Sequence, residues 1–133
     1  MILEAEKMTP VVDITEPKLQ KIIKSLRSFG PCSFATLTDE YGNYLQVGGG
    51  GVTCLIEKRD VLQQRHFRGY QSDKRRGCPD GTILTFGGGS VALLADEWFS
   101  SAQAVEIFVC FLNRESLPGY VLWREVNLIP VAG

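Results

Sequence analysis

The chain of 133 residues is 44% hydrophobic and 22% charged, and its formal net charge is −1 at pH 7. These values are typical of a globular protein with one core, and they indicate a single domain over residues 1–133. Apolar runs are far shorter than the roughly 20 residues that span a bilayer, and charged residues interrupt the amino terminus where a signal peptide would be apolar. We therefore expect a cytoplasmic protein that has no membrane partner.

The first regular element that the sequence predicts is a helix, which follows an extended lead-in over residues 1–13. Thr15 is a good N-cap residue, Pro17 suits the first turn, and Gly30-Pro31 should end the helix. Apolar residues at helical spacing would pack on the core. These residues are Leu19, Ile22, Ile23, Leu26 and Phe29.

A glycine-rich phrase then occurs twice, over residues 45–57 and 84–96. Each copy is an apolar run, three or four small residues, a second apolar run and an acidic residue. Glycine inside a strand costs roughly 0.5–1 kcal/mol against alanine. We therefore interpret the glycines as turns between strands, or as places where another backbone comes close. A phosphate-binding loop would need a lysine after the glycines, but Val52-Thr53 and Val91-Ala92 follow instead.

The remaining patterns predict an α+β fold. Strands are expected over residues 32–38, 44–47, 52–59, 61–71, 82–86, 91–95 and 120–126. Because Asp39–Asn43 is a turn signal, the first three form an antiparallel meander. Ser100 and Gln103 have the spacing of a capping box and open a second helix, which Leu117-Pro118 would end. The result is a mostly antiparallel sheet of about 6–7 strands, with the N-terminal helix and a helix in the C-terminal third packed on one face.

Residues 58–76 form a basic segment, with seven lysines and arginines against two aspartates. Phe67 and Tyr70 lie among the arginines, and basic residues interleaved with aromatic ones can bind nucleic acid. The alternative interpretation is a strand or edge segment whose charges are solvated and protect the edge. The sequence leaves both interpretations open.

Patterns that would indicate catalysis are missing from the sequence. His66 is the only histidine and lies in no Cys–His signature, and the four cysteines lack the paired spacing of zinc ligands. Acidic residues in turns could form an acid–base pair, but such residues are commonly solvated or capping groups. We expect no catalytic site, no metal and no cofactor, and therefore a non-enzymatic binding protein.

The last third of the chain carries a resemblance to a known family. Glu97-Trp98 precedes the capped helix of residues 102–112, and Leu117-Pro118 and Val121–Val126 follow it. This arrangement resembles the C-terminal signature of a family of bacterial immunity proteins, which accompany polymorphic toxins in contact-dependent and type VI competition. Tyr44–Val47, after an acidic-aromatic turn, is similar to the central strands of that family. The resemblance covers residues 32–126.

The resemblance implies a protein that stays in the cytoplasm of the toxin-producing cell and covers the active site of a cognate toxin domain. Several partners of related immunity proteins are nucleic-acid-modifying enzymes, deaminases among them. Because such enzymes carry basic grooves, acidic groups beside aromatic rings are the natural contact residues. These candidates are Asp39, Glu40, Tyr41, Asp96, Glu97 and Trp98.

Three alternatives accompany this prediction. If the toxin surface is acidic, the binding face would instead be formed by Arg65, Arg68 and Tyr70. In a further interpretation Trp98 staples the entrance of the second helix and Trp123 is a core residue, so that neither contacts a partner. The third alternative belongs to a different functional class: a small nucleic-acid-binding module that uses residues 58–76. Its binding would fall steeply with salt concentration.

Overall fold

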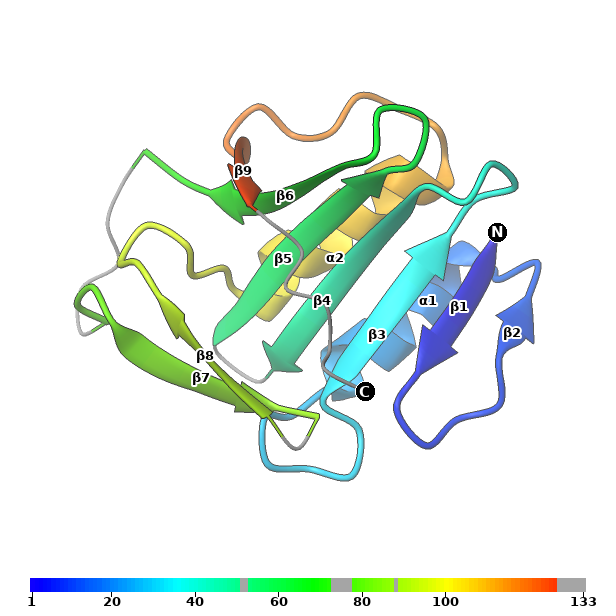
Figure 1. Ribbon diagram of the computed structural model, residues 1–133. Coiled ribbons are helices and arrows are strands. Elements are labelled where there is room, and N and C mark those ends of the chain that lie inside the picture. The colour runs from blue at the N-terminus through cyan, green and yellow to red at the C-terminus, as the bar shows by residue number, and fades with distance from the viewer. Residues whose placement is uncertain (51–52, 73–77, 88, 127–133) are drawn as a thin grey trace.

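The computed structural model describes residues 1–50, 53–72, 78–87 and 89–126. It has the α+β architecture predicted from the sequence: a seven-stranded antiparallel sheet, a separate two-stranded hairpin, and two helices packed on the sheet (Figure 1). In chain order the elements are β1 (Ile2–Ala5), β2 (Val11–Val12), α1 (Glu16–Ser25), β3 (Phe34–Thr38), β4 (Tyr44–Gly50), β5 (Thr53–Asp60), β6 (Arg65–Tyr70), β7 (Thr82–Phe86), β8 (Gly89–Leu93), α2 (Ser101–Leu112) and β9 (Leu122–Val126).

The large sheet has the strand order β2-β1-β3-β4-β5-β6-β9, and every pairing is antiparallel. Both helices cover one face of this sheet (Figure 1). Ile56 belongs to the core under the helices, whereas its neighbour Leu55 packs with Leu84, Leu93 and Trp98. Because successive residues of a strand point to opposite faces, the β7–β8 hairpin covers part of the face opposite the helices. The protein therefore has a main core and a smaller second one.

Most of the features predicted for α1 are confirmed. Leu19, Ile22 and Ile23 are buried, and Thr15 stands at the N-cap position, although its side chain makes no capping hydrogen bond. The prediction for Phe29 was wrong, because the helix ends at Ser25 and Phe29 lies beyond it with 90% of its surface exposed. Among the described residues, neither α1 nor α2 has the length and apolarity needed to cross a membrane.

Helix α2 begins with the predicted capping box. The Gln103 backbone N–H donates to the Ser100 hydroxyl (3.1 Å), and the Ser100 backbone N–H donates to the Gln103 side chain (3.0 Å). The helix ends at Leu112 and does not continue to Leu117, because Arg114 adopts a left-handed conformation (φ +58°) that no helix continues. Its buried residues are Ala104, Ile107 and Phe108, which pack in the main core.

The extended lead-in predicted over residues 1–13 is part of the sheet. This segment forms β1 and β2, and β1 pairs with β3 over four residues that include Leu3, which is buried in the main core. The sequence pattern of β1 is too short to identify a strand. Its place is decided by the exposed edge of β3, which lies about thirty residues later in the chain.

The glycine phrases have two different structures. The second forms the predicted hairpin, with its turn at Gly87, although the strand expected over Val91–Ala95 runs from Gly89 to Leu93. In the first, the turn interpretation was wrong for Gly48–Gly50, which belong to β4 and pair with residues 53–55 of β5. Close approach of another backbone, the second reason that the sequence suggested, applies at Gly50, where a Cβ would overlap the backbone carbonyl of Leu26. At Gly48 the neighbour is a side chain, since a Cβ there would lie 2.8 Å from the ring of Phe86. Residues 51, 52 and 88 lie outside the described residues.

Candidate functional site

Two hairpin turns meet at one end of the sheet. Residues 39–43 join β3 to β4 and residues 61–64 join β5 to β6, and the pairing of Tyr44 with Arg59 brings these turns together. The Asn43 side-chain oxygen accepts a hydrogen bond from the backbone N–H of Val61 (2.9 Å) and so links the two turns. The Asp39 carboxylate accepts from the backbone N–H groups of Tyr41 (2.9 Å) and Asn43 (3.0 Å). These bonds hold both turns in one conformation.

Large apolar side chains are exposed on these turns. Leu62 is 93% exposed, Tyr41 is 73% exposed and Val61 is 41% exposed. With Asn43 they line a hollow of about 430 Å³. Two carboxylates stand beside them on the first turn. We call this region the turn-end surface; it consists of Asp39, Glu40, Tyr41, Val61 and Leu62.

Sequence reasoning found only the first turn of this surface. Asp39 shapes the turn, Tyr41 presents its ring to solvent, and Glu40 forms an exposed ion pair with Arg114, whose hydrogen bond lowers the pKa of the Glu40 carboxyl. Val61 and Leu62 were assigned to the start of a strand. The signal for a turn was Asp60, because its carboxylate accepts the backbone N–H of Gln63 (3.1 Å) in the manner of a turn-initiating aspartate.

The second predicted group, Asp96 to Trp98, is turned inward. Glu97 and Trp98 are only 2% and 3% exposed. The Glu97 carboxylate accepts from Arg124 (2.9 Å) and from the backbone N–H of Leu94 (2.7 Å), and Asp96 pairs with Arg124 at 3.2 Å. The segment after β8 also lies away from the turn-end surface (Figure 1). The structure therefore does not bring the two predicted acidic groups together.

The residues of the alternative face are engaged within the protein. Arg68 lies 3.2 Å from Glu57 and 3.8 Å from Glu97, Arg65 pairs with Glu125, and the guanidinium of Arg124 lies 4.3 Å from the ring centre of Tyr70. A continuous set of charges results, which we call the ion-pair chain. Its members are Glu57, Arg68, Glu97, Arg124 and Asp96. Sequence reasoning missed Arg124, which only the pairing of β9 with β6 places beside these carboxylates.

His66, the only histidine, is buried beside this chain. Its Nε2 lies 3.5 Å from a Glu57 carboxylate oxygen, and its ring centre lies 6.1 Å from that of Tyr44. Its Nδ1 has no hydrogen-bond partner among the described residues. Because the side chain is almost completely enclosed, it supports the sheet and does not face a substrate.

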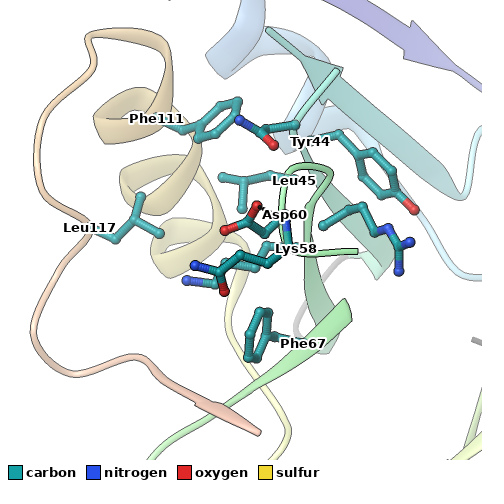
Figure 2. Close-up of a pocket in the computed structure, with 10 residues that line it drawn as sticks. Tyr44, Leu45, Lys58, Asp60, Phe67, Phe111 and Leu117 are labelled. Atoms are coloured by element: carbon teal, nitrogen blue, oxygen red, sulfur yellow. Dashed lines mark hydrogen bonds between the residues drawn. The ribbon is translucent and has the colours of Figure 1, made fainter. Parts of the chain in front are cut away.

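A pocket of about 360 Å³ lies beside the turn-end surface, between the sheet and the end of α2 (Figure 2). Figure 2 shows Phe111 and Leu117 on α2 and the loop after it, and Phe67 on β6. The Lys58 ammonium lies 4.5 Å from the ring centre of Trp123 and 5.2 Å from that of Phe67. Burial lowers the pKa of Lys58, although the charge of Asp60 acts in the opposite direction. The lining residues are Asn43, Tyr44, Leu45, Lys58, Arg59, Asp60, Gln63, Phe67, Phe111 and Leu117.

No known protein family and no curated protein matches this chain. Its function is therefore inferred from its own geometry. Within the described ranges, no three histidine, cysteine, aspartate or glutamate side chains gather as metal ligands would. Two solvent-accessible features suit binding: the apolar turn-end surface and the pocket that contains the half-buried Lys58.

The Glu57 carboxylate gives a prediction about stability and pH. Burial raises its pKa, but the hydrogen bond from His66 and the charge of Arg68 outweigh burial, so the net pKa lies below the ordinary value of 4.5. A folded-state pKa below the unfolded one stabilises the fold above that ordinary value, and this contribution is lost as the pH falls through the folded pKa. We expect Glu57→Gln to lose less unfolding free energy than the wild type between about pH 7 and about pH 3, in urea titrations.

The exposed Glu115 provides the control for this measurement. Glu115→Gln should keep the pH dependence of the wild type, because its carboxylate lies in solvent. Equal pH dependence of Glu57→Gln and the wild type would show that Glu57 is not stabilised by its neighbours.

Proposed function

We propose that this protein binds another protein through the turn-end surface, and that its partner is a bacterial toxin domain which it neutralises by covering the active site. The observation that carries the proposal is the exposure of Leu62 and Tyr41 beside a hollow, on turns that internal hydrogen bonds hold rigid. Exposed apolar patches rimmed by polar residues mark interaction sites. The resemblance of the sequence to immunity proteins supports the identity of the partner.

The chemistry of the surface suits such a partner. Tyrosine is among the residues that contribute most to binding at interfaces, and a rigid turn loses little conformational entropy when it binds. Asp39 and Glu40 place carboxylates beside the apolar centre. These carboxylates are complementary to the basic groove of a nucleic-acid-modifying enzyme. A contact area of about 800 Å² per partner would extend from the turns over the neighbouring strand ends.

Nucleic-acid binding by residues 58–76 is a weaker candidate. Arg65 and Arg68 pair with carboxylates, and Lys58 lies over aromatic rings, so these cations would have to leave their partners to contact phosphates. Residues 73–76 of the basic segment lie outside the described residues. At the turn-end surface Glu40 also pairs with Arg114, but the exposed side chains of Tyr41 and Leu62 contact a partner without breaking an ion pair.

The proposal predicts loss of partner binding when the surface is truncated. The chain would be co-expressed with the protein encoded immediately upstream of its gene, and rescue of growth, co-purification and affinity would be measured. We expect Tyr41→Ala and Leu62→Ala each to weaken binding by about 2 kcal/mol, which is roughly thirtyfold.

Phe29→Ala is the matched control, since Phe29 is an aromatic residue outside this surface that is even more exposed than Tyr41. It should bind as the wild type does. If both turn variants bind the partner as tightly as the wild type does, the partner contacts another face of the protein. If the protein encoded upstream is not toxic and does not co-purify, the toxin proposal is wrong. Titration with labelled DNA and RNA would then test nucleic-acid binding by residues 58–76.

A further inference from the structure

Lys58 occupies an unusual position for a charged residue. It lies on β5, where it pairs with Leu45 on one side and Phe67 on the other. Leu45 belongs to the main core, so Lys58 points to the face of the sheet that the helices cover. Its ammonium lies over the rings of Trp123 and Phe67. A cation has thus been placed at the margin of an apolar core.

The charge of Lys58 is not matched by a carboxylate ion pair within the part of the chain that the structure describes. By contrast, Arg65, Arg68 and Arg124 on the neighbouring strands each contact a carboxylate directly. The aromatic rings attract the ammonium, but they cannot accept its three hydrogen bonds as oxygen atoms would. A half-buried ammonium in this state favours an anionic ligand that approaches from the pocket.

The pocket beside Lys58 supplies the rest of a binding site. Phe67, Phe111 and Leu117 form apolar walls, and the amides of Asn43 and Gln63 lie among the lining residues. Two of the lining residues are cations and one, Asp60, is a carboxylate, so the charge balance of the lining is positive. Asp60 also accepts a backbone hydrogen bond in its own turn. Ligand pockets usually have volumes of about 300–1,000 Å³, so this one suits a group the size of a single ring.

We propose that this pocket binds a carboxylate carried on a small aromatic or branched apolar group. The carboxylate pairs with the Lys58 ammonium, and the apolar part packs against Phe67, Phe111 and Leu117. Such a group occurs in free small-molecule acids and at the carboxyl-terminal residue of a protein chain. The inference goes beyond the proposed function, because the pocket binds this group without any contribution from Tyr41 or Leu62.

The test compares a carboxylate with its neutral analogue. The intact protein would be titrated with 3-phenylpropionate and with 3-phenylpropionamide, and binding would be followed by calorimetry and by the NMR signal of the Trp123 indole N–H. We expect the acid to bind at least about tenfold more tightly than the amide, because the ion pair is a charge-assisted hydrogen bond.

Two lysine variants test whether Lys58 causes the tighter binding of the acid. Lys58→Met keeps an apolar stem and removes the charge, and it should abolish the preference for the acid. Lys24→Met makes the same change on the exposed last turn of α1 and should leave the preference intact. Equal affinity for acid and amide, no binding of either probe, or an unchanged preference in Lys58→Met would overturn the inference.

A peptide pair identifies the source of the carboxylate. A short peptide that ends in phenylalanine would be titrated with a free and with an amidated carboxyl terminus. Preference for the free peptide terminus assigns the pocket to a chain end, and binding of phenylpropionate alone assigns it to a small molecule. Either result, if lost in Lys58→Met, supports the inference. The outcome is independent of partner binding by the turn-end surface, so failure of one proposal is distinguishable from failure of the other.

Discussion

Replacing Glu97 with alanine is expected to lower the free energy of unfolding by about 3–5 kcal/mol, the usual cost of removing one partner from a buried ion pair. Glu97 is nearly inaccessible to solvent and holds Arg124, Arg68 and the backbone N–H of Leu94. Without its carboxylate, two guanidinium groups lose an acceptor, and the Leu94 N–H is left without its hydrogen bond. Urea unfolding monitored by circular dichroism would measure the change.

Glu125→Ala is the matched control for this experiment. Glu125 also pairs with an arginine of β6, but both side chains are about half exposed. Exposed ion pairs usually contribute about 0.2–1 kcal/mol, so this variant should remain close to the wild type. If both variants lose the same stability, burial of Glu97 has no special role, and the Asp96–Trp98 segment would again be open to partner contacts.

The substitution Gly50→Ala is expected to destabilise the protein by about 3 kcal/mol, at the upper end of the usual range for overpacking. A Cβ at this position would overlap the backbone carbonyl of Leu26 and lie 2.8 Å from its side chain. Leu26 is itself buried in the main core at the end of α1. The new methyl group would therefore push β4 and the end of α1 apart, because the clash involves backbone atoms, which cannot move away by a change of rotamer.

Gly119→Ala tests whether this effect depends on the site. No atom lies within 4 Å of the Cβ position at Gly119, and we expect a change within about 0.5 kcal/mol. Thermal and urea unfolding of both variants would compare them. Equal stability of the two variants would show that β4 and α1 separate without cost.

The sequence predicted those parts of the fold that depend on local signals. The capping box of Ser100 and Gln103, the apolar face of α1 and the hairpin at Gly87 are all determined by residues close together in the chain. The strand β1 was missed because its partner, β3, is distant in sequence. The same reason explains Gly48 and Gly50, which are glycines because Phe86 and Leu26 approach them from other elements.

The candidate site was predicted in part for similar reasons. The turn at Asp39 was recognisable, and Tyr41 is exposed as expected. An acidic residue next to a tryptophan, as in Glu97-Trp98, is compatible with an exposed contact patch and with a buried pair. The sequence does not show which applies, because the ion pair between Arg124 and Glu97 forms only in the folded protein. The reverse applies to Leu62: an apolar residue in a predicted strand suggests burial, but Leu62 is exposed because it lies in a turn.

The ion-pair chain also bears on the order in which parts of the protein fold during synthesis. It joins residues from β5, β6, the segment after β8, and β9. A ribosome completes Glu57, Arg68 and Glu97 well before it releases Arg124, so the nascent chain holds carboxylates that still await a guanidinium. Contacts between residues so far apart in sequence form late in folding. The ion pairs of this face are therefore expected to form completely only after β9 has emerged from the ribosome.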